Sequence, residues 1–214
     1  MGKKIISFSV WGTDTKYTNG ALKNIEAAKE HYPDWTCRFY VANNVPRPMV
    51  EALELNACEV VKVDRDGDKD GLFWRFYPAW DPEVDVFLVR DTDSLIGPRE
   101  AAAVKQWMES DKPFHIMRDS ISHSAPIMGG MWGAKQGFMP EFKAELDAYV
   151  AAMAPTPMGD ARTQYFNSDQ LFLSAKVWPV IKNKAMAHDE YHCHSGTEIP
   201  YPRPLMDGET HIGA

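Results

Sequence analysis

The sequence predicts an α/β fold with a mostly parallel central sheet flanked by helices, and three observations lead to this prediction. Short strand-like segments alternate, over the first half of the chain, with segments whose apolar residues recur at helical spacing. One strand-like segment contains the continuous apolar run Val86–Val89, as expected for a parallel strand covered on both faces. The 214 residues, 44% of them hydrophobic, suffice for one substantial core and are few for two.

The first half of the chain alternates strand and helix in regular order. Lys4–Val10 predicts the first strand, and Asn19–His31 predicts a helix that Thr18 or Asn19 would cap. Leu22 and Ile25 share one face of that helix. The alternation continues with the strand Trp35–Val41, the helix Pro46–Leu55, the strand Cys58–Val63, the short helix Leu72–Trp80 and the strand Val84–Val89. This order implies a doubly wound sheet.

The alternation loosens after residue 118. The segments expected in the second half are the helix Pro98–Glu109, the strand Phe114–Met117, a strand or turn over 125–135, and helices over Pro140–Met153 and Ser168–Ala175. From Tyr191 onward the chain is rich in Pro, Gly and His and predicts irregular structure. We therefore expect one domain over residues 1–190 and an irregular C-terminal tail over 191–214 packed on it.

Composition excludes several classes of partner. The net charge of −7 argues against nucleic acid, whose binding proteins usually carry a basic stripe. No apolar run reaches the length of a membrane span, and the N-terminal segment does not resemble a signal peptide. The three cysteines form no even disulfide framework. We expect a cytoplasmic protein, either complete or one module of a larger one.

Two carboxylates follow the strand predicted at Val84–Val89. Asp91 and Asp93, separated by Thr92, lie at the carboxyl end of that strand, where ligands of open α/β sheets bind. Such a pair can hold one hard divalent cation, because Mg²⁺ usually takes one or two carboxylates plus substrate phosphate oxygens. The alternative is an acidic loop in which Asp93 or Ser94 caps the next helix.

Other polar and aromatic residues follow the strands of the first half. The turn after the first strand lacks a glycine-rich nucleotide fingerprint, but Trp11 and Tyr17 can stack on a nucleoside. Core packing is the alternative for Trp11. Asp64 follows the third strand and is a candidate nucleotide contact. Arg75 lies among aromatic residues and can reach metal-bound phosphates, with a surface salt bridge as the alternative.

The second half adds four further candidates. Gly129 and Gly130 would let a sugar or phosphate approach the backbone, unless they mark a bulge or turn. Asp169, in the first turn of a predicted helix, is a catalytic candidate or simply a favourable partner of the helix dipole. His188 ends an apolar segment and is a candidate third metal ligand.

In combination, these motifs resemble small glycosyltransferases of the GT-A fold, a Rossmann-like fold, over residues 4–190. They are similar to sugar transferases of bacteria and large algal (chlorella) viruses that share an RDxDS…RE pattern. The motifs that carry the resemblance are RDTDS at 90–94 with RE at 99–100, FWRF at 73–76, MRD at 117–119, PIMGGMWG at 126–133, SDQLFL at 168–173 and HD at 188–189.

This resemblance implies a nucleoside diphosphate sugar donor, usually a UDP-sugar, held with Mn²⁺ or Mg²⁺, and a glycan or other hydroxyl acceptor. It implies metal-binding roles for Asp91, Asp93 and His188. The loop from Trp11 to Tyr17 would hold the nucleoside, and Gly129–Gly130 would lie where donor sugar and acceptor meet. The base of an inverting reaction would be Asp169, with Asp119 as the second candidate.

Two other functions use the same features. A non-catalytic, metal-dependent carbohydrate-binding module would use the acidic loop over residues 64–71 and exposed aromatic residues. A haloacid-dehalogenase-type phosphohydrolase also places Asp-x-Asp at a strand end, but usually after the first strand rather than the fourth. The sequence does not identify the sugar, the acceptor or the stereochemical outcome.

Overall fold

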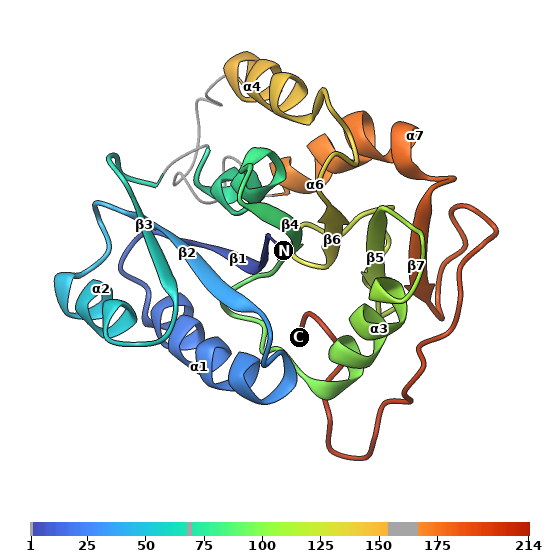
Figure 1. The fold of residues 1–214 in the computed structure, drawn as a ribbon, viewed down its shortest axis with the longest axis horizontal. Coiled ribbons are helices and arrows are strands. Elements are labelled where there is room, and N and C mark those ends of the chain that lie inside the picture. The colour runs from blue at the N-terminus through green and yellow to red at the C-terminus, as the bar shows by residue number, and fades with distance from the viewer. Residues whose placement is uncertain (1, 68–69, 154–166) are drawn as a thin grey trace.

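A seven-stranded sheet forms the centre of the structure, a computed structural model that describes residues 2–67, 70–153 and 167–214 (Figure 1). Its strands are β1 (Lys3–Val10), β2 (Thr36–Ala42), β3 (Glu59–Val63), β4 (Val84–Val89), β5 (Phe114–Arg118), β6 (Trp132–Lys135) and β7 (Ala185–Asp189). They lie in the order β3-β2-β1-β4-β6-β5-β7. Only β6 runs antiparallel to its neighbours, β4 and β5. The prediction of a mostly parallel α/β sheet is confirmed.

Helices cover both faces of the sheet. They are α1 (Thr15–His31), α2 (Arg47–Glu54), the 3₁₀-helix η1 (Gly71–Trp80), α3 (Pro98–Met108), α4 (Phe142–Ala152), α6 (Ser168–Phe172), the π-helical turn η2 (Leu173–Val177) and α7 (Trp178–Ile181). In Figure 1, α1, α2 and α3 lie on one side, and α4, α6 and α7 on the other. Each side has its own cluster of buried apolar residues.

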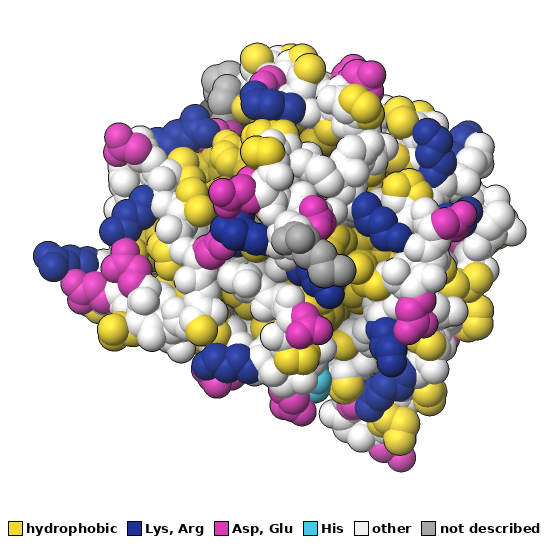
Figure 2. Space-filling view, in the orientation of Figure 1, with side chains coloured by type: hydrophobic (Ala, Val, Ile, Leu, Met, Phe, Trp, Pro, Cys, Tyr) yellow, Lys and Arg dark blue, Asp and Glu magenta, His cyan; other side chains and the backbone are white. Residues whose placement is uncertain are grey.

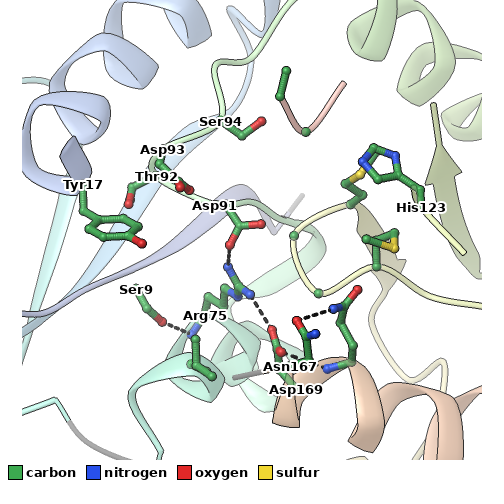
Figure 3. A pocket seen from close by; sticks show the side chains of 18 of the residues that line it. Ser9, Tyr17, Arg75, Asp91, Thr92, Asp93, Ser94, His123, Asn167 and Asp169 are labelled. Carbon is green, nitrogen blue, oxygen red and sulfur yellow. Dashed lines mark hydrogen bonds and ion pairs between the residues drawn. The ribbon is translucent and has the colours of Figure 1, made fainter. Parts of the chain in front are cut away.

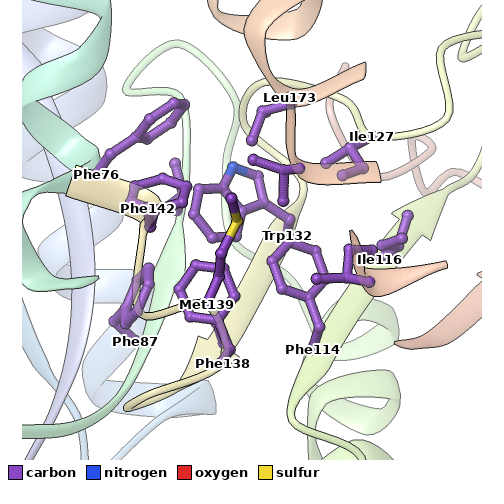
Figure 4. Packing of buried hydrophobic residues seen from close by; sticks show 14 of the residues in the cluster. Phe76, Phe87, Phe114, Ile116, Ile127, Trp132, Phe138, Met139, Phe142 and Leu173 are labelled. Carbon is purple, nitrogen blue, oxygen red and sulfur yellow. The ribbon is translucent and has the colours of Figure 1, made fainter. Parts of the chain in front are cut away.

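The core on the α4 side is built around Trp132 of β6 (Figure 4). The ring of Phe114 stacks on Trp132 with centroids 5.1 Å apart, and Phe76 of η1 meets it edge-on at the same distance. Aromatic side chains bury large apolar areas and gain further from such geometry. This packing fixes η1 and β6 against each other, and both lead directly into the site described below.

Two helix boundaries differ from the predictions. The first helix begins at Thr15 rather than near Asn19, because the side chain of Asp14 accepts a hydrogen bond of 3.0 Å from the backbone N of Lys16. An acidic N-cap satisfies one of the free N–H groups at a helix start, so the expected caps lie inside the helix instead. The helix expected over Ser168–Ala175 continues through η2 and α7 as far as Ile181.

The surface carries both signs of charge. On the face shown in Figure 2, acidic and basic side chains are interspersed with scattered apolar ones. A nucleic-acid-binding face would instead gather its basic residues in a stripe or patch. Within the described ranges, none of the helices combines the length and the apolar character that a membrane crossing requires.

Candidate active site

A cavity of about 420 Å³ opens beyond the carboxyl ends of β1 and β4. The chain leaves β1 toward β2 and returns to β4 on the other side of β1, so these parallel neighbours form a topological switch point, where α/β sheets bind ligands. The volume lies within the usual range for small-molecule sites. The lining residues are Ser9, Trp11, Lys16, Tyr17, Leu72, Arg75, Asp91, Thr92, Asp93, Ser94, His123, Met128, Gly129, Gly130, Met131, Asn167, Asp169, Gln170, Gly213 and Ala214.

The loop that presents Asp91 and Asp93 is fixed by α1. Fully buried Asn24 donates from Nδ2 to the carbonyl oxygens of Thr92 (3.2 Å) and Ser94 (3.1 Å). Its Oδ1 accepts a hydrogen bond of 3.0 Å from the backbone N of Ile96. One turn earlier the helix touches the loop directly, since a Cβ at Gly20 would lie 1.9 Å from the carbonyl oxygen of Thr92.

Arg75 of η1 joins two of the predicted acidic residues (Figure 3). Its Nη2 donates to Asp169 Oδ2 at 2.6 Å, and its Nη1 pairs with Asp91 Oδ1. The backbone N of Arg75 donates to Ser9 Oγ at 2.9 Å, which ties η1 to β1. Burial alone would lower the pKa of Arg75, but the two carboxylates hold that pKa above its ordinary value. The guanidinium is therefore a fixed positive charge inside the cavity wall.

Asp169 is a buried carboxylate at the start of α6, only 4% exposed. Burial raises its pKa more than the ion pair with Arg75 and the hydrogen bond from the backbone N of Gln170 lower it. A carboxylate with a raised pKa holds a proton more firmly than an ordinary aspartate. Asp169 consequently combines contact with the cavity and the basicity that a proton acceptor needs.

The Asp91–Asp93 pair has the chemistry of a site for a hard divalent cation. The two side chains are 43% and 24% exposed, and each already has a basic partner: Arg75 for Asp91, and Lys16 for Asp93 at 2.8 Å. Among the described residues, the second carboxylate oxygen of each aspartate accepts no hydrogen bond. No described group of three or more His, Cys, Asp or Glu is arranged to hold a metal. Two carboxylates plus phosphate oxygens and water match the usual Mg²⁺ environment.

His188 does not belong to this pair, which corrects the sequence-based expectation. It is fully buried in β7 and does not line the cavity. Its Nδ1 lies 2.8 Å from His115 Nε2, and its Nε2 lies 3.0 Å from Gln106 Oε1. Both ring nitrogens are engaged by protein groups, so the imidazole has no free position to offer a metal in this arrangement.

Asp119 and Asp64 also lie outside the cavity. Asp119 is 2% exposed, pairs with Arg99 through two nitrogens and accepts a hydrogen bond of 3.0 Å from the backbone N of Ile212. A carboxylate occupied in this way is a structural anchor, and this corrects its prediction as a second catalytic candidate. Asp64 is exposed and accepts a hydrogen bond of 3.2 Å from Asn43 Nδ2.

Two buried ion pairs hold Arg90, Arg99 and Glu100 of the RDxDS…RE pattern. Arg90 Nε donates to Glu100 Oε1 at 3.0 Å, with both side chains 3% exposed, and Arg90 Nη1 donates to the carbonyl oxygen of Trp132. Arg99 forms the pair with Asp119 described above. These pairs join α3 to the ends of β4 and β5. None of the four residues lines the cavity, so these pairs have a structural role next to it.

The remaining predicted residues line the cavity. Trp11 packs against Gly67 and Gly71, because a Cβ on Gly67 would lie 2.2 Å from the Cβ of Trp11 and one on Gly71 would lie 3.0 Å from Trp11 Nε1. Gly130 and Gly129 lie directly against the two carboxylates: a Cβ on them would lie 1.9 Å from Asp91 Oδ2 and 2.3 Å from Asp169 Oδ2, respectively. Only glycine permits this approach of the backbone to both carboxylates.

Several lining residues were not predicted. Lys16 belongs to a turn that was expected to precede the first helix. Asn167 precedes the first residue of α6; it adopts a left-handed backbone (φ 62°), and its Oδ1 accepts a hydrogen bond of 2.7 Å from Gln170 Nε2. The C-terminal tail was expected only to pack on the domain, and its residues Gly213 and Ala214 line the cavity beside His123. The path of an irregular tail leaves no periodic signal in a sequence.

At the level of sequence, neither a protein-family model nor a characterised protein matches this chain. Among solved structures, the mannosyltransferase PcManGT from Pyrobaculum calidifontis, solved in complex with GDP-Man and Mn²⁺, aligns with a TM-score of 0.50 and 12% identity. The alignment covers 89% of this chain and 55% of that one.

Two further solved structures align less well. A glycosyltransferase involved in glycosylation of the major capsid of PBCV-1 gives a TM-score of 0.49 and 14% identity, over 87% of this chain and 81% of that one. Glucosyl-3-phosphoglycerate synthase of M. tuberculosis gives 0.45 and 12%, over 64% of this chain and 58% of that one. The chain thus spans little more than half the length of two of these three proteins.

This chain has the GT-A fold, and the fold is what the likeness to the mannosyltransferase establishes. The expectation drawn from the sequence motifs is confirmed at that level. Because a fold hosts many activities, the function has to be argued from the cavity and its residues.

Proposed function

We propose that this protein is a metal-dependent glycosyltransferase that moves a sugar from a nucleoside diphosphate sugar to a hydroxyl acceptor. The observation that carries the proposal is the cluster of Asp91, Arg75 and Asp169 at the switch point between β1 and β4. These residues bring a carboxylate, a guanidinium and a buried aspartate together in one cavity, and their chemistry suits metal binding, phosphate binding and proton acceptance. The GT-A fold supports the same function by analogy.

In this proposal Asp91 and Asp93 hold Mn²⁺ or Mg²⁺. When bound, the metal supplies positive charge that stabilises the departing nucleoside diphosphate. Arg75 contributes to the same end, because a guanidinium forms strong charge-assisted hydrogen bonds with phosphate oxygens. Its hydrogen bond to Asp169 keeps the guanidinium at the cavity wall before the donor arrives.

The donor would be bound along the cavity from the nucleoside to the sugar. Trp11 and Tyr17 offer aromatic surfaces for the base, and the loop at Thr92 offers backbone groups for the ribose and phosphates. Gly129 and Gly130 line the same cavity as Asp91 and Asp169, and without side chains they leave the cavity side of this wall open to the sugar. We propose a UDP-sugar as the donor and a glycan as the acceptor.

Asp169 is the proposed catalytic base of an inverting transfer. It would take the proton of the acceptor hydroxyl as that oxygen attacks the anomeric carbon. Its raised pKa suits this task, since a stronger base accepts the proton more readily. Asp119, fixed by Arg99, is not proposed for this role. The cytoplasm is the proposed compartment, in keeping with three cysteines that are all free thiols.

The test is isothermal titration calorimetry of UDP, once with Mn²⁺ and once with EDTA. The wild type should bind UDP only with the metal, and Asp91→Asn should lose that binding at least tenfold while keeping the fold. Asp147→Asn is the matched control, because Asp147 is an exposed aspartate on α4 whose side chain is 62% exposed. It should bind UDP like the wild type.

Transfer and hydrolysis of UDP-sugars are measured next, with the same three proteins. Product formed by the wild type and by Asp147→Asn, but not by Asp91→Asn, supports the proposal. If UDP, GDP and dTDP all fail to bind in the presence of Mn²⁺, the transferase function is wrong. Glycan binding without any nucleotide binding would instead favour a non-catalytic carbohydrate-binding module.

A further inference from the structure

Lys16 separates two hollows on the surface. It lies in the first turn of α1, and its Nζ is 2.8 Å from Asp93 Oδ2. Lys16 and Asp93 line the cavity described above, and both also line a neighbouring hollow of about 400 Å³ together with Lys23. The ammonium group thus occupies the junction between the metal-binding carboxylates and open solvent, with its side chain 65% exposed.

The charges of the cavity explain why a lysine is placed there. Its described acidic side chains are Asp91, Asp93 and Asp169, and its described Lys and Arg side chains are Lys16 and Arg75. With three carboxylates and two cations, this cluster of side chains carries one net negative charge while no metal is bound. A divalent ion on the aspartates would make the cluster positive, because three carboxylates would then face four positive charges.

Once Asp91 and Asp93 coordinate a metal, the electrostatic attraction between Lys16 and Asp93 is weakened. The ammonium would be repelled by the adjacent divalent ion, and Asp93 would already be neutralised. A diphosphate carries the negative charge that this arrangement lacks. Lys16 also lies in the first turn of a 17-residue helix, where the helix dipole favours an anion.

We propose that Lys16 binds the diphosphate of the donor, exchanging Asp93 for a phosphate oxygen when metal and nucleotide bind together. The proposal rests on the proposed function and adds a residue to it. It assigns Lys16 two opposed effects: competition with the metal in the free protein, and attraction of the diphosphate in the metal-bound one. A lysine with only a structural role would not produce effects of opposite sign.

The test compares Lys16→Met with Lys23→Met, an exposed lysine on the same helix that lines only the neighbouring hollow. Binding of Mn²⁺ alone is followed by the electron paramagnetic resonance signal of the free ion. Binding of UDP at saturating Mn²⁺ is followed by calorimetry. Lys16→Met should bind Mn²⁺ about two- to fivefold more tightly, the range expected for loss of a partly exposed ion pair. It should bind UDP about tenfold more weakly, while Lys23→Met matches the wild type in both.

A third variant, Lys16→Arg, keeps the charge and should bind UDP within about threefold of the wild type. Weaker Mn²⁺ binding by Lys16→Met, or unchanged UDP binding, would overturn the exchange while leaving the proposed function intact. If the wild type itself binds no nucleoside diphosphate with Mn²⁺, both the function and the role of Lys16 are wrong. Thermal unfolding of each variant checks that the fold is retained.

Discussion

Arg75 and Asp169 form a buried ion pair in the wall of the cavity, although 94 residues separate them in the sequence. Nη2 of the arginine lies 2.6 Å from the carboxylate, and both side chains are 6% exposed. One residue comes from η1 and the other from α6, two elements that pack on the same side of the sheet. The pair therefore links the N-terminal and C-terminal halves of the chain at the place where the chemistry is proposed.

Replacing Arg75 with glutamine should destabilise the protein and abolish transfer. Two carboxylates would lose their common partner, and breaking a buried pair from one side costs about 3 kcal/mol in the free energy of unfolding. Urea denaturation measures this loss. Arg47→Gln, at an exposed arginine paired with Glu51, should change the free energy of unfolding by less than about 0.5 kcal/mol.

Arg75→Lys separates charge from geometry. A single ammonium cannot make the two parallel contacts of a guanidinium, so UDP affinity and transfer should still fall at least tenfold. The stability should lie between those of the wild type and Arg75→Gln, because one positive charge remains. Wild-type transfer by Arg75→Lys would mean that the bridge from Asp91 to Asp169 is not needed.

Asn24 holds the metal-binding loop, so Asn24→Ala should weaken both stability and metal binding. The carbonyl oxygens of Thr92 and Ser94 would lose a buried donor, at a cost of about 1–3 kcal/mol in the free energy of unfolding. Mn²⁺ titration should show weaker binding as the loop loosens. Asn19→Ala, the same change at an exposed position of α1, should leave both quantities as in the wild type.

Gly130→Ala should abolish metal binding with little loss of secondary structure. Its Cβ would lie 1.9 Å from Asp91 Oδ2, so the carboxylate or the backbone has to move. Gly97→Ala is the control, because no heavy atom lies within 4 Å of a Cβ at that position and its φ of −144° suits alanine. Equal Mn²⁺ affinities for the two variants would show that the wall at Gly130 does not set the position of Asp91.

The sequence predicted the sheet and the position of Asp91 and Asp93 because both depend on local patterns. A run such as Val86–Val89 followed by polar residues indicates a buried strand and the edge at which it ends. Arg75 was expected either to reach the phosphates or to form a surface salt bridge, and its side chain is buried in ion pairs with Asp91 and Asp169. The sheet and the two aspartates at its edge follow from periodicity and strand order alone.

The errors arose where tertiary contacts decide the role of a residue. His188 follows an apolar segment in the sequence, but its partners His115 and Gln106 come from β5 and α3. Asp119 was a catalytic candidate from its sequence position, but its carboxylate accepts hydrogen bonds from Arg99 and from the backbone N of Ile212 in the tail. Lys16 was expected in a turn, but Asp14 caps an earlier helix start and Lys16 lies in the first turn of α1, where it lines the cavity. None of these pairings has a signature in a single sequence.

The buried histidine pair makes a prediction about acid stability. His115 Nε2 and His188 Nδ1 are 2.8 Å apart, and Gln106 Oε1 accepts from His188 Nε2, an arrangement that suits two neutral rings. Burial lowers the pKa of His188 to about 4, and burial with the neighbouring His188 lowers the pKa of His115 as well. Both side chains are fully buried.

The free energy of unfolding should therefore decrease as the pH falls from about 6.5 to 4. In that range the histidines of the unfolded chain take up protons, whereas His188 in the folded protein does not until about pH 4. Each such group contributes a slope of up to about 1.4 kcal/mol per pH unit. Urea denaturation at several pH values measures it, and His188→Gln should lower stability at pH 7.5 but show a shallower slope. The same slope in both proteins would mean that His188 carries its proton in the folded state well above pH 4, and that the pair shares a charge instead of being neutral.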